Sequence, residues 1–300
     1  MPPSQYPSVG VTVNVNLLSL LRFLFCFGTV LLKMDVLVPT LEELQFCMKD
    51  LKCIRNVCIL AHVDHGKTTL SDLLLATNRL VSKRMAGFLR YLDDRPDEQE
   101  RGITMKSSAV SLLNLVHDDE DNTNKRILLN LIDTPGHIDF SSEVSDGAII
   151  LVDLLEGVCA QTRESIKKAF EEKAKMILVV NKFDKVILEL QKDIEDIFQC
   201  ILRVIEDCNA IVAELYQYEY LNNDVDIEDS GLLFSPDTGN VIFASAIDAW
   251  GFTTKQFAKM FIGLVKNETV ESLNEKMWNF DCYVDSKKRN KNWSCRQEEN

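Results

Sequence analysis

The sequence has little of what marks a zinc-binding protein or a protein that coats nucleic acid. Its nine cysteines include no C-x-x-C pair, and its four histidines do not fall at metal-ligand spacing from them. Scattered thiols of this kind are typical of buried cysteines in a reducing cytosol rather than of a zinc site. The net charge of −13 excludes a generally basic surface, although it leaves room for a local basic patch.

The sequence also lacks the pattern of a membrane span. Its apolar run at 17–32 has sixteen residues and is interrupted by Arg22. A spanning helix needs roughly 20 mostly apolar residues, and no Lys or Arg precedes the run as in a secretory signal. We expect residues 1–50 to be an atypical N-terminal extension that is not part of the fold, with Met34 as an alternative start. Membrane anchoring or targeting is the competing explanation.

From residue 51 onward the apolar pattern alternates between strands and helices. Near-continuous apolar runs predict parallel strands covered on both faces. The pair 108–115 and 126–132, joined by the acidic turn 117–124, predicts an antiparallel hairpin. The other predicted strands are 56–61, 148–152, 176–180 and 241–244, and the helices are 41–51, 67–80, 162–175, 188–215 with a break near Cys208-Asn209, and 253–265. This order indicates an α/β fold over residues 51–266, a doubly wound, mostly parallel six-stranded sheet with one antiparallel edge strand.

Residues 61–69 have the pattern of a phosphate-binding loop between a strand and a helix. Backbone N–H groups and the positive helix N-terminus surround the β-phosphate, the lysine neutralises the β/γ oxygens, and a hydroxyl ligates Mg²⁺. Ala61 stands where the usual pattern has Gly, so a buried strand–turn–helix without a ligand is the alternative. The pattern predicts a P-loop NTPase whose loop consists of Ala61, His62, Val63, Asp64, His65, Gly66, Lys67, Thr68 and Thr69.

Three further motifs each follow a predicted strand, which places them at the same edge of the sheet as the loop. They are Asp133-Thr134-Pro135-Gly136-His137, Asn181-Lys182-Phe183-Asp184 and Ser245-Ala246. A carboxylate such as Asp133 can hold Mg²⁺ through water, and the Gly136 amide can approach a γ-phosphate. Taken singly, each motif also fits an ordinary turn or a helix cap.

The last two motifs predict guanine rather than adenine as the base. The Asp184 carboxylate can accept from both N1–H and the 2-amino group, a pair of donors that adenine lacks. Asn181 can read the purine edge, and the stem of Lys182 can lie over the base plane. At the end of the last strand, a backbone amide of Ser245-Ala246 can meet the guanine O6. The expected cofactors are therefore GTP or GDP with Mg²⁺.

These motifs resemble those of the translational GTPases, the family of elongation factors G and 2. The resemblance rests on the phosphate loop, on Arg101-Gly102-Ile103-Thr104 and on Asp-Thr-Pro-Gly-His. Residues 86–93, 97–99, 105–108 and 244–252 are more similar to the elongation factor-like GTPases of ribosome assembly, with eukaryotic elongation factor 2 as a near relative. The resemblance covers roughly residues 50–285, and Trp278–Tyr283 still resembles the family's exit from the nucleotide domain.

The resemblance implies a cytoplasmic factor that uses GTP on the large ribosomal subunit to help release an anti-association factor. Its implied partners are that subunit with its RNA, a ribosome-maturation cofactor and the anti-association factor. Neither a membrane nor an oligomer is implied. The alternatives are the GTPase domain of a translocase-type elongation factor and a non-hydrolysing fragment that binds GDP or GTP.

The resemblance also assigns roles to individual residues. Thr68, Thr104 and, through water, Asp133 would hold Mg²⁺, and Thr69 would meet the α-phosphate. Thr104 would also sense the γ-phosphate, so that hydrolysis releases the first switch. His137 would be the catalytic residue that orients the attacking water when the ribosome positions it. Its alternative role is to cap the helix of the second switch.

Two departures from the family bear on activity. Only eight residues, 138–145, separate His137 from Asp146-Gly147, where the family has about fourteen and a strand-to-strand crossover needs roughly 10–12 or more. We therefore expect nucleotide binding to survive and switching and stimulated hydrolysis to be impaired. The second departure is the polar tail 267–300, which contains the basic run 287–291. We expect this basic run to be solvated, with an RNA contact as the alternative, and the tail to be the truncated start of a further segment.

Overall fold

The computed structural model of the chain contains two compact units, residues 29–253 and residues 1–28 with 254–300. The structure describes residues 41–78, 91–92, 108–118, 123–133, 146–189, 194–223, 233–262, 269–278, 282–284 and 293–295. The boundaries of the nucleotide domain expected from the sequence, 51–266, stay a prediction. Among the described residues, no helix has both the length and the apolar character that crossing a bilayer requires.

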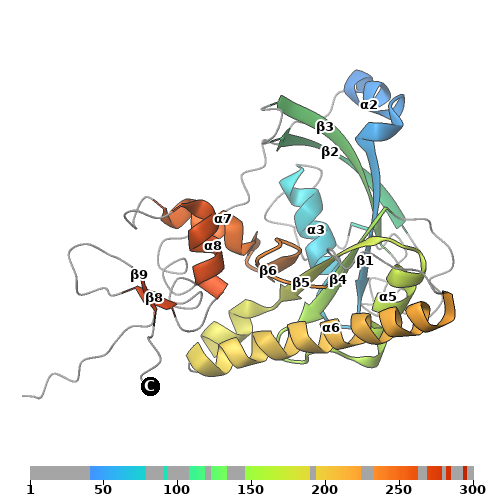
Figure 1. Cartoon of the computed structure of the whole chain (residues 1–300). Coiled ribbons are helices and arrows are strands. Elements are labelled where there is room, and N and C mark those ends of the chain that lie inside the picture. The colour runs from blue at the N-terminus through green and yellow to red at the C-terminus, as the bar shows by residue number, and fades with distance from the viewer. Residues whose placement is uncertain are drawn as a thin grey trace, which may run out of the picture. The chain divides into compact units, whose positions relative to one another are not determined.

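The first unit, residues 29–253, is built on a mixed sheet (Figure 1). Its described strands follow the order β2-β3-β1-β4-β5-β6-β7. Their bounds are β1 Ile54–Ala61, β2 Ser108–Asp118, β3 Thr123–Asp133, β4 Gly147–Asp153, β5 Lys175–Asn181, β6 Val241–Ser245 and β7 Trp250–Phe252. The strands β3, β1, β4, β5 and β6 run parallel, and β2 and β7 are antiparallel edges. The predicted fold class is thereby confirmed.

The sheet differs from the prediction at both edges. A seventh strand, β7, adds a second antiparallel edge; its three residues are too few to produce a periodic apolar pattern. In the β2–β3 hairpin, His117 pairs with Asn124 and Asp118 pairs with Thr123. The predicted acidic turn at 117–124 was therefore too long, because cross-strand pairing extends both strands into the polar segment.

The helices lie on both sides of this sheet, with α3 Lys67–Thr77 on one side and α5 Ala160–Glu171 and α6 Ile194–Asn223 on the other (Figure 1). The end predicted for α5, Lys175, was wrong because Lys175 begins β5. Lys173 adopts a left-handed conformation (φ 55°), and the amide of Ala174 donates to the carbonyl of Ala169. Such a helix end usually carries glycine, so a lysine there concealed the stop.

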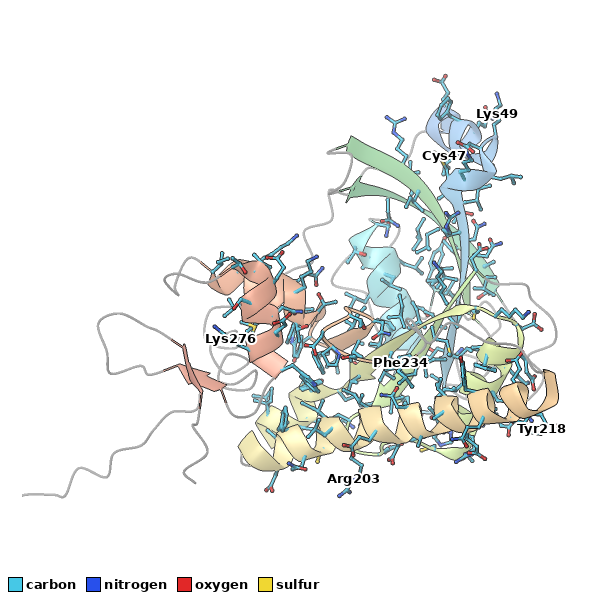
Figure 2. The ribbon with its side chains drawn as sticks, viewed as in Figure 1. Cys47, Lys49, Arg203, Tyr218, Phe234 and Lys276 are labelled. Carbon is cyan, nitrogen blue, oxygen red and sulfur yellow. The ribbon has the colours of Figure 1, made fainter. Side chains whose placement is uncertain are left out.

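Helix α6 is continuous through Cys208 and Asn209, where the sequence predicted a break. Cys208 is fully buried, and burial raises the pKa of its thiol to about 12. The Asn209 amide accepts from the Phe234 backbone N–H (2.7 Å) and donates to the Phe234 carbonyl (2.9 Å), beside the helix in Figure 2. A tertiary contact thus uses the polar groups that would otherwise favour a helix end.

Replacing Asn209 with alanine is expected to lower the free energy of unfolding by about 1–3 kcal/mol, because it leaves the Phe234 backbone groups without this partner. Urea unfolding followed by circular dichroism measures the change. Gln217→Ala removes an amide from an exposed position of the same helix and should shift the midpoint much less. Equal shifts for the two variants would show that the contact contributes nothing specific.

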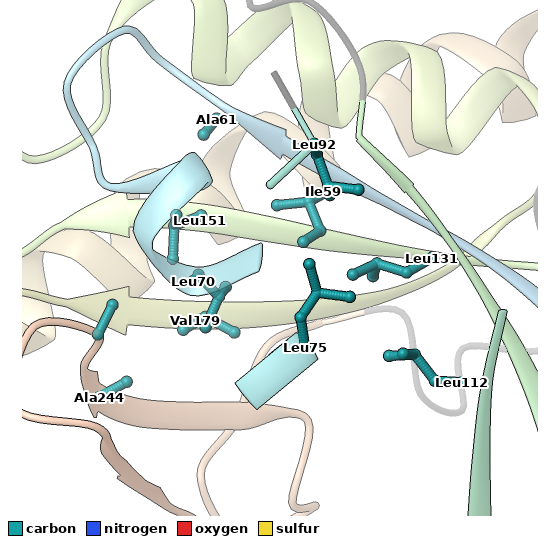
Figure 3. Packing of buried hydrophobic residues seen from close by; sticks show 11 residues of the cluster. Ile59, Ala61, Leu70, Leu75, Leu92, Leu112, Leu131, Leu151, Val179 and Ala244 are labelled. Atoms are coloured by element: carbon teal, nitrogen blue, oxygen red, sulfur yellow. The ribbon is translucent and has the colours of Figure 1, made fainter. Parts of the chain in front are cut away.

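The core on the α3 side of the sheet consists of aliphatic side chains from the strands and from α3 (Figure 3). Leu75 of α3 is fully buried against this face, together with Ile59 of β1 and Leu131 of β3. The amide of Tyr91 donates to Asp72 of α3 (3.1 Å), and the adjacent Leu92 is buried in the same cluster. This packing holds the start of α3 against the ends of the central strands.

The helix predicted before the first strand is present as α2 Leu41–Met48, followed by a short turn of 3₁₀ helix, Leu51–Cys53. Cys47 is 1% exposed and packs with Leu113 of β2 and Leu128 of β3. Residues 41–50 thus contact the sheet, although the notion that the N-terminal extension lies outside the fold stays a prediction. Residues 17–32 and Met34 lie outside the described residues.

The second unit contains α7 Thr254–Phe261, α8 Val270–Trp278 and two short strands. The strands β8 Cys282–Val284 and β9 Trp293–Cys295 pair antiparallel. Helix α7 lies within the predicted helix 253–265, and α8 and the β8–β9 pair were not predicted.

In the first unit, a five-residue π-helix, Lys185–Glu189, stands where the sequence predicted the beginning of the long helix 188–215.

Candidate functional site

The C-terminal ends of five parallel strands carry residues of the site, four of which are polar. They are Ala61 at the end of β1, Asp133 of β3, Asp153 of β4, Asn181 of β5 and Ser245 of β6. Ligands of doubly wound sheets bind at this edge. The sheet therefore assembles the sequence motifs that are more than 180 residues apart in the chain.

The phosphate loop turns sharply between β1 and α3. Gly66, at the helix N-cap, has φ 97°, and Asp64 has φ 63°. A Cβ atom on Gly66 would lie 2.5 Å from Nδ2 of Asn181. The loop thus needs glycine both for its backbone conformation and for the close approach of the β5 end.

Lys67 and Asp133 meet in the interior of the site. Lys67 Nζ lies 2.8 Å from Asp133 Oδ1, with the lysine side chain 10% exposed and the aspartate side chain fully buried. Two opposite charges at this separation and burial stabilise one another strongly, and each fixes the position of the other. The contact brings the lysine predicted to bind phosphate beside the carboxylate predicted to bind Mg²⁺ through water.

Asn181 joins the phosphate loop to the end of β6. Its Nδ2 donates to the His65 carbonyl (3.0 Å), and its Oδ1 accepts from the Ala246 amide (3.0 Å). The sequence assigned Asn181 to the purine edge and the amide to guanine O6. In the structure Asn181 bridges the two segments, and the Ala246 amide takes part in that bridge. The contacts of both groups with the base stay predictions.

The side of the site predicted to hold the base contains Asp184, Ser245 and Lys182. The Ser245 hydroxyl donates to Asp184 Oδ1 (2.7 Å), which orients the carboxylate. The same hydroxyl accepts from the Asp248 amide (3.2 Å). Burial, followed by the like charge of Asp184, raises the pKa of Asp248, while the hydrogen bond with Ser245 opposes that shift.

Lys182 has a left-handed backbone (φ 63°), and its Nζ lies 2.7 Å from Asp153 Oδ2. The Asp153 side chain is 2% exposed, and its other oxygen accepts from the Leu155 amide (2.8 Å). The ammonium group is thus held at the end of β4, and the aliphatic stem extends between the two strand ends. Sequence reasoning missed Asp153, because a carboxylate at the end of an apolar strand carries no motif of its own.

Two histidines of the loop contact the segment after β4. His62 Nδ1 is hydrogen-bonded to Gln161 Oε1, which also accepts from the Val63 amide (3.3 Å). His65 is fully buried, and this burial lowers its pKa, partly offset by its contact with the Leu151 carbonyl and by the charge of Glu156. Sequence reasoning also missed Gln161, whose contact with the loop depends on how β4 and α5 are joined.

Several predicted site residues have no described geometry. Thr104, Thr134, Pro135, Gly136 and His137 lie outside the described residues, and so does the segment 138–145. Thr68 and Thr69 lie in the first turn of α3, each half-buried. The geometry therefore bears on the phosphate loop, on Asp133 and on the base side, while the roles of the two switches stay predictions.

Comparison with known proteins gives a consistent result. The profile of the elongation factor Tu GTP binding domain matches residues 52–276. The chain is 45% identical over 268 residues to Ribosome assembly protein 1 of Schizosaccharomyces pombe, covering 85% of this chain and 26% of that protein. It is 45% identical over 271 residues to Ribosome assembly protein 1 of Saccharomyces cerevisiae, covering 82% of this chain and 24% of that protein.

A human relative, Elongation factor-like GTPase 1, is 40% identical over 287 residues, which cover 84% of this chain and 25% of that protein. The chain thus spans about a quarter of the length of these relatives. The match to the GTP binding domain profile, residues 52–276, covers the sheet and every described part of the site. It also agrees with the resemblance that the phosphate loop and the strand-end motifs indicate.

Proposed function

Because the chain belongs to the family of GTPases with an elongation factor Tu GTP-binding domain, we propose that it binds GTP and GDP at the strand ends and hydrolyses GTP slowly. The observation that carries this proposal is the assembly of Lys67, Asp133 and the base-side residues Asp184 and Ser245 at one edge of the sheet. Lys67 would neutralise the β/γ oxygens, and Asp184 would accept from the guanine N1–H and 2-amino groups.

The residues at the phosphate side fit a magnesium ion. Asp133 is a buried carboxylate at the end of β3, and Thr68 offers a hydroxyl in the first turn of α3. Mg²⁺ prefers oxygen ligands and keeps several of its waters. Asp133 can therefore contact the ion through a water while its Oδ1 stays beside Lys67. We propose Thr68, Thr104 and Asp133 as the protein groups that hold the ion, which would supply charge neutralisation between the phosphates.

The short connection after β3 is compatible with the sheet. Asp133 lies opposite Ile59 of β1, and Gly147 lies opposite Val57 of the same strand. The two strand ends are therefore about 12 Å apart, from the spacing of about 4.8 Å between strands and 3.3 Å per residue. Residues 134–146 could reach about 40 Å when fully extended. This reach exceeds the distance between the strand ends, and we propose that the helix expected after His137 is shortened to a turn or two.

The far end of this connection is fixed at Asp146. Its backbone amide donates to the Asn56 backbone carbonyl (2.8 Å), and its carboxylate accepts from the Asn56 backbone amide (2.8 Å). The Asp146 carbonyl also accepts from Lys175 at the start of β5 (3.2 Å). The connection therefore cannot gain length by peeling residues from β4 without breaking these bonds. This anchoring supports impaired positioning of His137 rather than impaired folding.

We expect GTP turnover by this chain to rise less than about twofold when large ribosomal subunits are added. A chimera that carries the longer connection of the S. pombe relative should respond by about tenfold or more, since stimulated phosphoryl transfer depends on positioning of the water. Phosphate release under single-turnover conditions measures both. His137→Ala in the chimera controls for contaminating hydrolysis. Equal stimulation of chain and chimera would contradict the proposed effect of the short connection.

For the whole protein we propose a role in ribosome assembly, in which GTP use on the large subunit helps release an anti-association factor. The name Ribosome assembly protein 1, borne by two of the relatives, supports the part in ribosome assembly. The release of an anti-association factor and a ribosome-maturation cofactor as partner are the finer parts of the proposal. A translocase-type elongation factor is the alternative within the same class. Release of the anti-association factor by the chimera, assayed beside translocation, separates the two: release supports assembly, and translocation supports the alternative.

A further inference from the structure

Three side chains with metal-ligating atoms converge behind the phosphate loop, on the segment that links β4 to α5. His65 Nε2 lies 3.2 Å from Glu156 Oε2 and 3.8 Å from Cys159 Sγ. All three ligand atoms lie within 4.8 Å of one another. The three residues do not form a local motif such as C-x-x-C or H-x-x-x-H. Two segments some ninety residues apart in the chain supply them.

The distances match those between ligands of one ion. Two atoms bound to a tetrahedral zinc at about 2.05–2.3 Å lie roughly 3.3–3.8 Å apart. The 3.2 Å and 3.8 Å separations from His65 Nε2 fall close to this range. The Glu156 side chain is 49% exposed, so its carboxylate can rotate to complete the set and leaves an entry path from solvent.

The surroundings of His65 allow Nε2 to act as a ligand. Its Nδ1 lies 3.3 Å from the Leu151 carbonyl and 3.3 Å from the Asp153 amide. With the proton on Nδ1, the ring donates to the carbonyl and Nε2 presents a lone pair, the arrangement usual for a metal-ligating histidine. With the proton on Nε2, Nδ1 accepts from the amide. The ring therefore keeps a backbone partner in either state.

Cys159 lies at the start of a helix, where burial and then the negative charges of Glu156 and Asp153 raise the pKa of its thiol. It is the N-cap of α5, a helix of twelve residues, and its own amide donates to Thr162 Oγ1 (3.3 Å). The positive end of the helix acts in the opposite direction, and a bound ion would replace the thiol proton, since metal binding releases protons from its ligands. The link that carries Glu156 is fixed as well, since the Gly157 amide donates to the Asp153 carbonyl (2.9 Å).

We propose that His65, Glu156 and Cys159 bind a divalent ion of the zinc class, with water as the fourth ligand. The Cys159 thiol loses its proton to solvent as the Zn–S bond forms. A sulfur, a nitrogen and an oxygen ligand together favour zinc over magnesium or calcium. The bound ion would tie the β4–α5 link to the phosphate loop. This site is distinct from the proposed magnesium site at Thr68 and Asp133, and zinc binding there requires no nucleotide.

The test is a titration of the purified 300-residue chain with Zn²⁺ in competition with a chromogenic chelator, repeated with Co²⁺. One high-affinity equivalent and a sulfur-to-cobalt charge-transfer band are expected. Cys159→Ser should weaken zinc binding about 100-fold or more and abolish the band, since loss of even an outer partner costs 10–100-fold. Serine keeps a capping oxygen at the start of α5, so this variant should fold.

The matched control is Cys53→Ser, because Cys53 also lies near a carboxylate, that of Asp50 (3.6 Å), and is not among the clustered ligands. Its zinc affinity should equal that of the parent. Glu156→Gln, at an exposed side chain, should weaken binding about tenfold by loss of a ligand. Zinc affinity unchanged in both Cys159→Ser and Glu156→Gln, or weakened as much in Cys53→Ser, would overturn the proposal.

Discussion

Replacing Gly66 with alanine is expected to weaken GDP binding by at least about 100-fold, which corresponds to roughly 2.7 kcal/mol. The new Cβ would lie 2.5 Å from Asn181 Nδ2. Asn181 is 1% exposed, and both ends of its amide are hydrogen-bonded, so it cannot move aside without losing its contacts to His65 and Ala246. The loop must then change shape, and its amides leave the phosphate. Titration with a fluorescent GDP analogue measures the loss.

Gly239→Ala is the matched control for this experiment. Gly239 also has a positive φ, 80°, but a Cβ at that position would meet no atom within 4 Å. Both variants therefore bear the cost of a left-handed alanine, about 1–2 kcal/mol. GDP affinity should stay within about threefold of the parent in Gly239→Ala, since its strain lies in a turn outside the site. If Gly66→Ala bound GDP equally well, the close approach of Asn181 would not limit the loop.

The second large effect is expected for Asp184→Asn, which should lower GDP affinity by about 100–1000-fold. A carboxylate that accepts from two donors contributes about 1.5–3 kcal/mol for each bond. The asparagine Oδ1 can still accept from the Ser245 hydroxyl, which lies 2.7 Å from Asp184 Oδ1. Its Nδ2 would then face the guanine donors and repel them. Xanthine carries a carbonyl at C2, so the variant should prefer xanthosine diphosphate to GDP.

Competition between the two nucleotides, measured by displacement of a fluorescent analogue, tests this change of preference. Asp248→Asn is the control, because Asp248 lies in the turn after β6 and its backbone amide donates to the Ser245 hydroxyl. It removes a neighbouring negative charge without removing the proposed acceptor of the base. Its affinity for GDP should change by less than about threefold, as expected for an exposed charge. Retained preference for GDP in Asp184→Asn would mean that another group reads the base.

The Gly66→Ala and Asp184→Asn experiments address different halves of one site. Gly66 concerns the backbone that surrounds phosphate, and Asp184 concerns the edge that selects the base. Asn181 connects them through the His65 carbonyl and the Ala246 amide. A change at either half is therefore felt through a buried side chain with little freedom to relax.

Much of the fold could be predicted from local pattern. The apolar runs that become β4 and β5 identified parallel strands, and the phosphate loop and the motifs after β3, β5 and β6 identified the functional edge of the sheet. These features depend on periodicity and on residues close together in the chain, which a sequence states directly. The class of fold and the guanine-nucleotide family follow from them.

Other features depend on contacts between distant segments. The continuity of α6 at Asn209 depends on Phe234. The roles of Asp153 and Gln161 depend on where β4 and α5 meet the phosphate loop. No local pattern reveals these partners, because each hydrogen bond or ion pair joins residues that are far apart in the chain and close together only in the folded protein.

The sequence by itself therefore determined the α/β class, the phosphate loop and the motifs for a guanine nucleotide, since each is local. The tertiary structure decided which polar atoms of those motifs form hydrogen bonds with one another. It made Asn181 a bridge between the His65 carbonyl and the Ala246 amide, and it brought Glu156 and Cys159 to His65. The physical reason is that a buried polar group must find a partner wherever the packed chain offers one.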